Sequence, residues 1–225
     1  MKVIGLVIAV IEEVEALLEA SYKVKKIEEF PYEIYEAQIG NNKLYICHSG
    51  CGEIYAASAT QYLITKFNCE LILNYGICGA ISPALNKLDT CIVKEIINYD
   101  FDTDPIDHKG VGYYTNLKTS ILTPSKELIK KAKSIVDLPL YRVCSGNRFI
   151  DKEEEKEYLH KTFNAEICEM ESAAIYLVAK QNNVDTLFIK GVSDSYHDNG
   201  LTYSEMAKIS AKHACEIFIK IIKDL

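Results

Sequence analysis

The chain has 225 residues, of which 48% are hydrophobic and 25% are charged, and this composition excludes disorder as its main state. No run of about 18 apolar residues lacks a charge, so the sequence predicts no membrane span. The net charge of −7 argues against nucleic acid as a partner, because binding phosphates requires a basic face. The length favours one domain over residues 1–225, built around one sizeable core.

The first part of the chain alternates strands and helices. A continuous β-branched run predicts a strand over Val3–Val10, of the kind that is buried on both faces of a sheet, and a helix follows over Glu12–Ala20. The pattern then predicts strands over Tyr22–Ile27, Tyr32–Ile39 and Lys43–His48, a helix over Tyr55–Phe67, and a strand over Leu71–Asn74 that ends in a glycine-rich turn at 76–79.

The second part repeats this alternation around an irregular, polar segment at 100–120, a candidate functional loop. Strands are expected over Thr90–Tyr99, Leu140–Ser145, Ala165–Glu169 and Thr186–Val192. Helices are expected over Ser125–Val136, Lys152–Phe163, Glu171–Gln181 and Tyr203–Lys223, the second of them as a charged surface helix. The sequence therefore predicts an α/β fold, with three αβα layers and a central twisted sheet that is mixed because of the meander at 22–48.

The eight cysteines do not suggest a disulfide framework. Most of them lie within or beside apolar runs, and the N-terminal segment is interpreted as a strand and not as an export signal. We therefore expect reduced, buried thiols in a cytoplasmic protein. Cys47, His48 and Cys51 resemble a metal cluster, but no second pair with standard spacing accompanies them, so no metal is predicted.

Acidic residues recur at the predicted carboxyl ends of strands, where ligands bind in α/β sheets. They are Glu13, Glu169, Glu171 and Asp194. Each one alone could be a carboxylate that stabilises a helix N-terminus, but together they favour a carboxylate site. Residues 49–57 match only part of a dinucleotide-binding pattern, which a tight strand-to-helix turn also explains.

Several segments together carry a resemblance to a known family. They are Ala9–Val14, Ser49–Gly52, Asn74–Ala80, Asp100–Asp102, Ser145–Ile150, Glu169–Ala173 and Val192–Asp194. In this order and spacing the chain resembles 5′-methylthioadenosine/S-adenosylhomocysteine nucleosidases of the nucleoside phosphorylase superfamily, over nearly its whole length. The resemblance implies a nucleoside phosphorylase-like fold, a nucleoside substrate, water as the nucleophile and no cofactor.

The resemblance also implies residue roles. Glu13 is expected to orient and deprotonate the attacking water, and Asp194 to protonate N7 of the leaving purine. Glu171 is expected to hold the ribose hydroxyls, with Met170 packed under the sugar. Because Asp194 must be protonated to act, we expect burial and neighbouring carboxylates to raise its pKa.

Further implied contacts surround the base and the 5′ end of the substrate. Phe149 is expected to stack on the base, the backbone of Ile150 to bind its edge, and Tyr203 to line the 5′-substituent pocket. Glu169 and Ser193 belong to the same motifs and are also expected to contact substrate. The family forms homodimers, which implies that the loop at 99–114 carries Ile106 into the neighbouring subunit's pocket. The alternative is that this loop is a lid over the pocket of its own subunit.

Two departures from the family pattern concern the nucleophile. Ile77 stands where these nucleosidases have a serine, and Lys190 stands where they have an arginine. The sequence therefore leaves two alternatives to a nucleosidase open: a phosphorylase that uses phosphate, and a nucleoside-binding protein that has lost turnover. With only two arginines in the chain, a guanidinium clamp on phosphate is the less favoured of the chemistries.

Overall fold

The computed structural model describes residues 2–20, 23–197 and 203–225, with the side chains of 203–205 left out. The strands are β1 (Val3–Ile8), β2 (Lys25–Glu28), β3 (Glu33–Ile39), β4 (Asn42–His48), β5 (Leu71–Ala80), β6 (Thr90–Asn98), β7 (Leu140–Ser145), β8 (Ile167–Glu169) and β9 (Asp185–Asp194). The helices are α1 (Ile11–Glu19), α2 (Glu53–Phe67), α3 (Asp104–Asp107), α4 (Lys126–Ile135), α5 (Glu153–Phe163), α6 (Ser172–Gln181) and α7 (Tyr203–Asp224).

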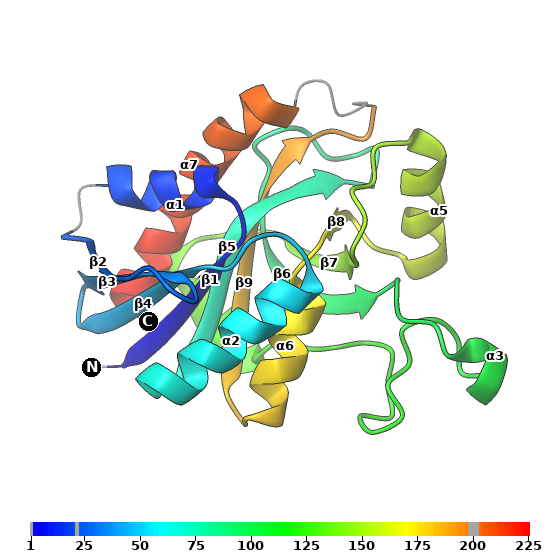
Figure 1. Ribbon diagram of the computed structural model, residues 1–225. Helices are drawn as coiled ribbons and strands as arrows, with labels where there is room; N and C mark the ends of the chain where they lie inside the picture. The colour runs from blue at the N-terminus through cyan, green and yellow to red at the C-terminus, as the bar shows by residue number, and fades with distance from the viewer. Residues whose placement is uncertain (1, 21–22, 198–202) are drawn as a thin grey trace.

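One sheet of nine strands organises the chain, in the order β2-β3-β4-β1-β5-β8-β7-β6-β9 (Figure 1). β1 pairs in parallel with β4 and β5, and β5 pairs in parallel with β9. The β2–β3, β3–β4, β5–β8 and β6–β9 pairs are antiparallel, so the predicted mixed sheet is confirmed. Because β9 pairs with both β5 and β6, the strands β5, β9, β6, β7 and β8 close into a ring, a feature the sequence pattern did not predict.

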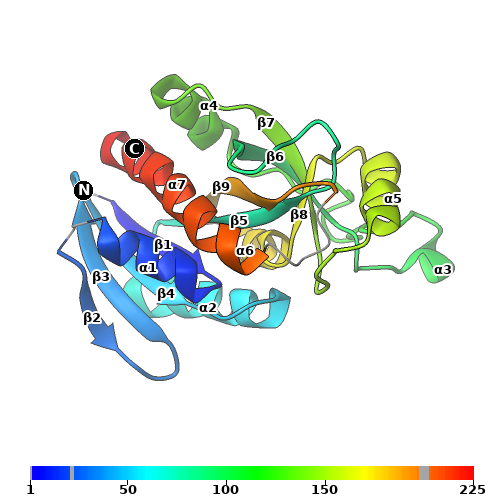
Figure 2. The same cartoon turned by 90° about the horizontal axis from the view of Figure 1, so that it is seen from above.

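Alternating side chains of the central strands fill a core on each face of the sheet. Leu71, Leu73 and Tyr75 of β5 belong to the core that α1 and α7 cover, whereas Ile72 and Cys78 belong to the core that α2 and α6 cover. Figure 2 shows α1 and α7 side by side against the same part of the sheet. The predicted three-layer arrangement is therefore confirmed, because the period of two along a strand sends apolar residues to both faces.

Two sequence-based expectations need correction. β5 does not end at Asn74: it continues through the glycine-rich segment to Ala80, so these glycines lie in a strand and not in a turn. The helix α5, expected to be a charged surface helix, carries the fully buried Lys156 on its inner face. The segment at 100–120 is irregular as expected, apart from the short helix α3.

Candidate active site

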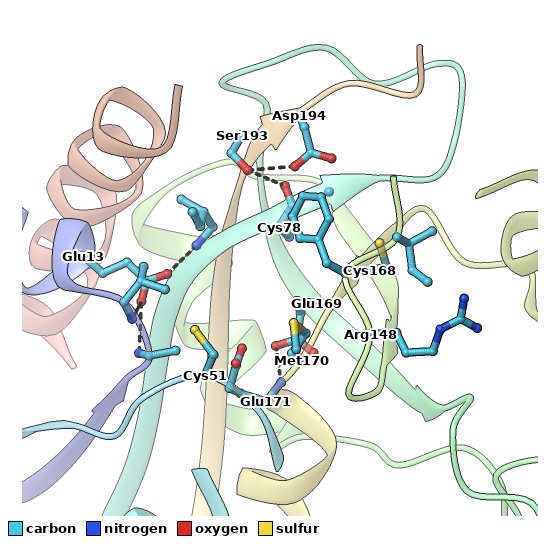
Figure 3. Close-up of a pocket in the computed structure, with 16 residues that line it drawn as sticks. Glu13, Cys51, Cys78, Arg148, Cys168, Glu169, Met170, Glu171, Ser193 and Asp194 are labelled. Atoms are coloured by element: carbon cyan, nitrogen blue, oxygen red, sulfur yellow. Dashed lines mark hydrogen bonds between the residues drawn. The ribbon is translucent and has the colours of Figure 1, made fainter. Parts of the chain in front are cut away.

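A pocket of about 540 Å³, its open mouth included, lies at the carboxyl ends of β1, β5, β8 and β9 (Figure 3). It is lined by Ala9, Val10, Glu13, Cys51, Ile77, Cys78, Gly79, Arg148, Phe149, Ile150, Cys168, Glu169, Met170, Glu171, Ser193 and Asp194. Most of the residues that the sequence singled out therefore lie around one cavity, because parallel strands bring their carboxyl ends to one edge of a sheet.

Glu13 lies on the first turn of α1 and is buried against β5. Its Oε1 accepts a hydrogen bond from the backbone N–H of Ile77 at 2.8 Å, and its Oε2 accepts from those of Ala9 at 3.1 Å and Val10 at 3.3 Å. Burial raises the pKa of Glu13, while attraction to Lys190 and these N–H groups opposes the rise. A carboxylate with a raised pKa and a fixed orientation is suited to accept a proton near neutral pH.

Gly76 explains how Glu13 comes so close to β5. A Cβ at this position would lie 2.5 Å from Oε1 of Glu13, a distance that real side chains do not tolerate. Gly79 has the same relation to the second carboxyl, since a Cβ there would lie 2.8 Å from Oδ2 of Asp194. The glycines that resemble a turn in the sequence are therefore required by the close approach of two carboxyl groups.

Asp194 ends β9 and is buried at the opposite side of the pocket from Glu13 (Figure 3). The hydroxyl of Ser193 donates to its Oδ1 at 2.9 Å, and Nζ of Lys156 lies 3.7 Å from its Oδ2. A positive charge therefore lies close to Asp194, and the raised pKa expected from neighbouring carboxylates stays a prediction. Ser193 therefore both lines the pocket and donates a hydrogen bond to Asp194.

Lys190 is buried on β9 behind the carboxylates. Its Nζ donates to Oε2 of Glu169 at 2.9 Å. Burial alone would lower the pKa of Lys190, but attraction to Glu169, Glu171 and Glu13 outweighs it and raises the pKa, so the side chain stays charged. Lys190 therefore acts from behind these carboxylates and is not among the pocket-lining residues.

Glu169 is anchored from several directions. Its carboxylate accepts hydrogen bonds from the backbone N–H groups of Glu171 at 3.2 Å and Ser172 at 3.0 Å, in addition to Lys190. Burial would raise the pKa of Glu169, but the Lys190 ammonium and the hydrogen bonds hold it below its usual value. Glu169 is therefore an ionised group that stabilises the start of α6 and the ammonium.

Glu171 is the N-cap residue of α6 and lies on the floor of the pocket. The backbone N–H of Gly52 donates to its Oε1 at 2.8 Å, which ties the carboxyl to the loop before α2. Burial and the neighbouring Glu169 raise the pKa of Glu171 to about 7. With one oxygen held by Gly52, the carboxyl has acceptor capacity left for a ligand hydroxyl.

Apolar residues complete the pocket. Met170 and Phe149 line it, and Phe149 is 48% exposed, so a flat ligand in the pocket could contact its ring. Ile150 is buried beside it, and Ile77 provides both an apolar wall and the N–H that binds Glu13.

Two predicted site residues remain, Ile106 and Tyr203. Ile106 lies on α3, is 84% exposed and is not among the pocket-lining residues of its own subunit. The side chain of Tyr203, at the start of α7, lies outside the described residues.

Sequence reasoning missed several residues at the pocket. Cys51, Cys78 and Cys168 line it, and burial raises the pKa of each thiol, so that of Cys51 is about 11. Lys156, beside Asp194, was assigned to a solvated surface. Its spacing of three residues from Leu159, the other buried residue of α5, places both on one face and was a signal that this lysine faces inward.

Within the described ranges, no group of three or more His, Cys, Asp or Glu side chains is arranged to hold a metal ion. Over the same ranges, each helix is too short or too polar to span a bilayer.

Known proteins share both the sequence and the architecture. The model of the phosphorylase superfamily matches residues 3–223, so the chain belongs to this superfamily. An aminodeoxyfutalosine nucleosidase from Campylobacter jejuni is 27% identical over 230 residues, with all of both chains covered. A 5′-methylthioadenosine/S-adenosylhomocysteine nucleosidase from Staphylococcus carnosus is 28% identical, covering 99% of this chain and 100% of the other.

Comparison with solved structures supports the same fold. The 5′-methylthioadenosine/S-adenosylhomocysteine nucleosidase of Campylobacter jejuni superposes with a TM-score of 0.89 at 26% identity, with all of both chains covered. A futalosine hydrolase mutant of Helicobacter pylori gives a TM-score of 0.93 at 21% identity, again with all of both chains covered, and at that identity it supports the fold alone.

Proposed function

We propose that this protein is a hydrolase that cleaves the N-glycosidic bond of a purine nucleoside. The observation that carries the proposal is the pair of buried carboxyl groups, Glu13 and Asp194, at separate sides of one pocket that Glu171 also lines. They approach Gly76 and Gly79 of β5, and three residues of extended strand span about 10 Å. The two carboxyl groups therefore approach β5 at separate places, as an acid at the base and a base at the sugar require.

In the proposed reaction, the N9–C1′ bond breaks and its electron pair goes to the base. Asp194 gives its proton to N7 of the purine, and the oxygen of a water molecule bonds to C1′ while one of its protons goes to Glu13. Asp194 ends ionised, Glu13 ends protonated, and the base leaves neutral. Positive charge develops on the sugar in the transition state, where Glu13, Glu169 and Glu171 oppose it.

The charges around the pocket favour water over phosphate. Both guanidinium groups of the chain are engaged, Arg142 with Glu95 at 2.7 Å and Arg148 with Glu155 at 2.5 Å. Lys190 is bound to Glu169. Arg148 lines the pocket, but a phosphate dianion would have to compete with Glu155 for it and would meet carboxylates at the sugar, whereas water needs only a base.

The departures at Ile77 and Lys190 are compatible with hydrolysis. Ile77 lacks a hydroxyl, but its backbone N–H still orients Glu13. Lys190 keeps a buried positive charge that attracts Glu13 and Glu171. Turnover is therefore favoured over a binding protein that has lost it.

The relatives' names suggest the nucleosides to test: 5′-methylthioadenosine, S-adenosylhomocysteine and aminodeoxyfutalosine. Incubation of each with the purified protein, with and without inorganic phosphate, should release free base and free sugar at the same rate in both. A sugar 1-phosphate product would replace the hydrolase with a phosphorylase. Tight nucleoside binding with no base release would favour the binding protein.

We further propose a homodimer that acts in the cytoplasm, in methionine salvage. Cys47, Cys69 and Cys215 are among the buried free thiols that suit a reducing compartment. The exposed Ile54 and Ile106 supply apolar surface for a subunit contact in which Ile106 reaches the partner's pocket.

Ile106→Asp should then weaken association and catalysis together, because a buried unpaired charge is costly. Analytical ultracentrifugation and base release measured on the same sample would test this. A fully active wild-type monomer at micromolar concentration would exclude the dimer.

A further inference from the structure

Lys156 is an unusual residue for its helix. α5 carries glutamates at 153–155 and 157, and its outer face is exposed, yet the side chain of Lys156 is 0% exposed. Burying an ammonium group is costly unless charge partners and hydrogen-bond acceptors replace water. The contacts of Lys156 therefore indicate the role of its buried positive charge.

Those contacts converge on the end of β9. Nζ of Lys156 donates to the backbone carbonyl of Ser195 at 2.8 Å and lies 3.7 Å from Oδ2 of Asp194, whose side chain is 4% exposed. The longer distance is that of a charge pair and not of a hydrogen bond. A second link joins the same two segments, since Glu153 and His197 are 2.8 Å apart. α5 thus holds the chain on the carboxyl side of Asp194 while Ser193 holds Oδ1.

We infer that Lys156 is a positioning residue that acts through Asp194: it aims the carboxyl group at the base and stabilises the carboxylate left when the proton moves to N7. The inference rests on the proposed function, because it gives Lys156 a role in the protonation of a leaving purine. Lys156 itself is not among the pocket-lining residues, so it would act on the substrate through Asp194.

The ammonium group of Lys156 is a close positive charge beside Asp194. The titratable groups that face it include Lys156 from α5, Cys78 from β5 and Cys168 from β8. Burial raises the pKa of both thiols well above its usual value, so both stay neutral. At low effective dielectric, an ammonium at 3.7 Å favours the ionised form of the carboxyl.

This charge has opposite effects at the two ends of the pH range. Where Asp194 is protonated, Lys156 speeds proton donation, because it stabilises the product carboxylate. At higher pH it favours loss of the proton before substrate is cleaved, which lowers activity. Removing the charge should therefore slow the reaction at low pH and extend activity to higher pH, so that the two pH profiles cross. A defect in folding or packing would scale the whole profile down instead.

The experiment compares kcat and KM from pH 5 to 10 for the wild type, Lys156→Met and Lys156→Arg, with a nucleoside that the wild type cleaves. Lys156→Met should lower kcat on the acid side about threefold and move the basic limb up by about one pH unit, with KM changed less. Because proton transfer is only partial in the transition state, the loss of kcat is smaller than the shift of the limb, and the variant becomes the faster enzyme at high pH. Lys156→Arg, which keeps the charge, should retain the position of the wild-type limb. The matched control is Lys161→Met on the exposed face of α5, which should leave the profile unchanged.

A double-mutant cycle supplies an independent readout. In an Asp194→Asn background, Lys156→Met should cost little further activity, because the charge has no carboxyl left to act on. If Lys156→Met lowered kcat as much in the Asp194→Asn background as in the wild type, the inference would be overturned. A pH profile of Lys156→Met that lay below the wild-type profile at every pH would also overturn it.

If the wild type cleaves no nucleoside, the proposed function fails, but Lys156 can still be tested. The titration of the Asp194 carboxyl, followed by ¹³C NMR, should move to higher pH in Lys156→Met. An unmoved titration would show that Lys156 does not act on this group.

Discussion

Each end of the pocket has a glycine of β5, a buried lysine and buried carboxyl groups, but the number of carboxyl groups around the lysine differs. At the end that we propose binds the sugar, which we call the sugar end, Glu13 lies over Gly76, and the buried Lys190 attracts three carboxyl groups. At the end that we propose binds the base, called the base end, Asp194 lies over Gly79 and has the buried Lys156 as a close charge partner. In the proposed reaction, the three carboxyl groups would oppose positive charge on the sugar, while one carboxyl beside one ammonium would suit a group that loses a proton.

The largest effect should come from breaking the base end. Asp194→Asn keeps the size of the side chain but cannot donate the carboxyl proton, so kcat should fall by about 10²-fold or more while nucleoside binding is retained. Base release and equilibrium binding measured on one preparation would check this. Turnover near the wild-type value would mean that another group is the general acid. His197 would then be the first residue to substitute.

Alanine substitutions at the two glycines of β5 should affect the two ends of the pocket separately. A methyl group at Gly76 would displace Glu13, and one at Gly79 would displace Asp194, so each alanine variant should lower kcat about tenfold or more. Gly76→Ala should alter the acidic limb of the pH profile and Gly79→Ala the basic limb. Each variant thus serves as the control for the other. Identical changes in both would mean that the strand is generally disturbed.

Glu171 tests whether the sugar end recognises the sugar. Glu171→Gln should weaken riboside binding about tenfold but leave the affinity for free adenine nearly unchanged, because an amide offers one acceptor oxygen where a carboxylate offers two. Calorimetric titration with both ligands would measure the difference. Equal losses for riboside and base would make Glu171 a structural cap of α6.

The smallest expected effect is the pH dependence of the same contact. With a pKa of about 7, Glu171 is ionised above that pH and protonated below it. Its capacity to accept ribose hydroxyls should therefore decline as pH falls, and the KM for a riboside should rise about threefold from pH 7.5 to 6.5. Glu171→Gln should abolish this dependence. A flat KM for the wild type would contradict the assignment.

Much of the fold follows from local pattern. The apolar alternation of β3 and β4 and the continuous run of β1 predicted these strands within a few residues, and Ala207, Ala211 and Phe218 were placed correctly on the buried face of α7. β5 was predicted too short, because glycine is common in turns. Nothing in a local window shows that a carboxylate from another element will occupy the space that a missing side chain leaves.

The sequence by itself determined which residue types stand at strand ends, and therefore that Glu13, Glu169, Glu171 and Asp194 would meet at one edge of a sheet. It did not determine the charge around each of them. Only the tertiary structure decided that Lys190 would neutralise the sugar end in part and that Lys156 would reach Asp194. The physical reason is that electrostatic effects depend on distance and burial between segments far apart in the chain, and neither is encoded in local periodicity.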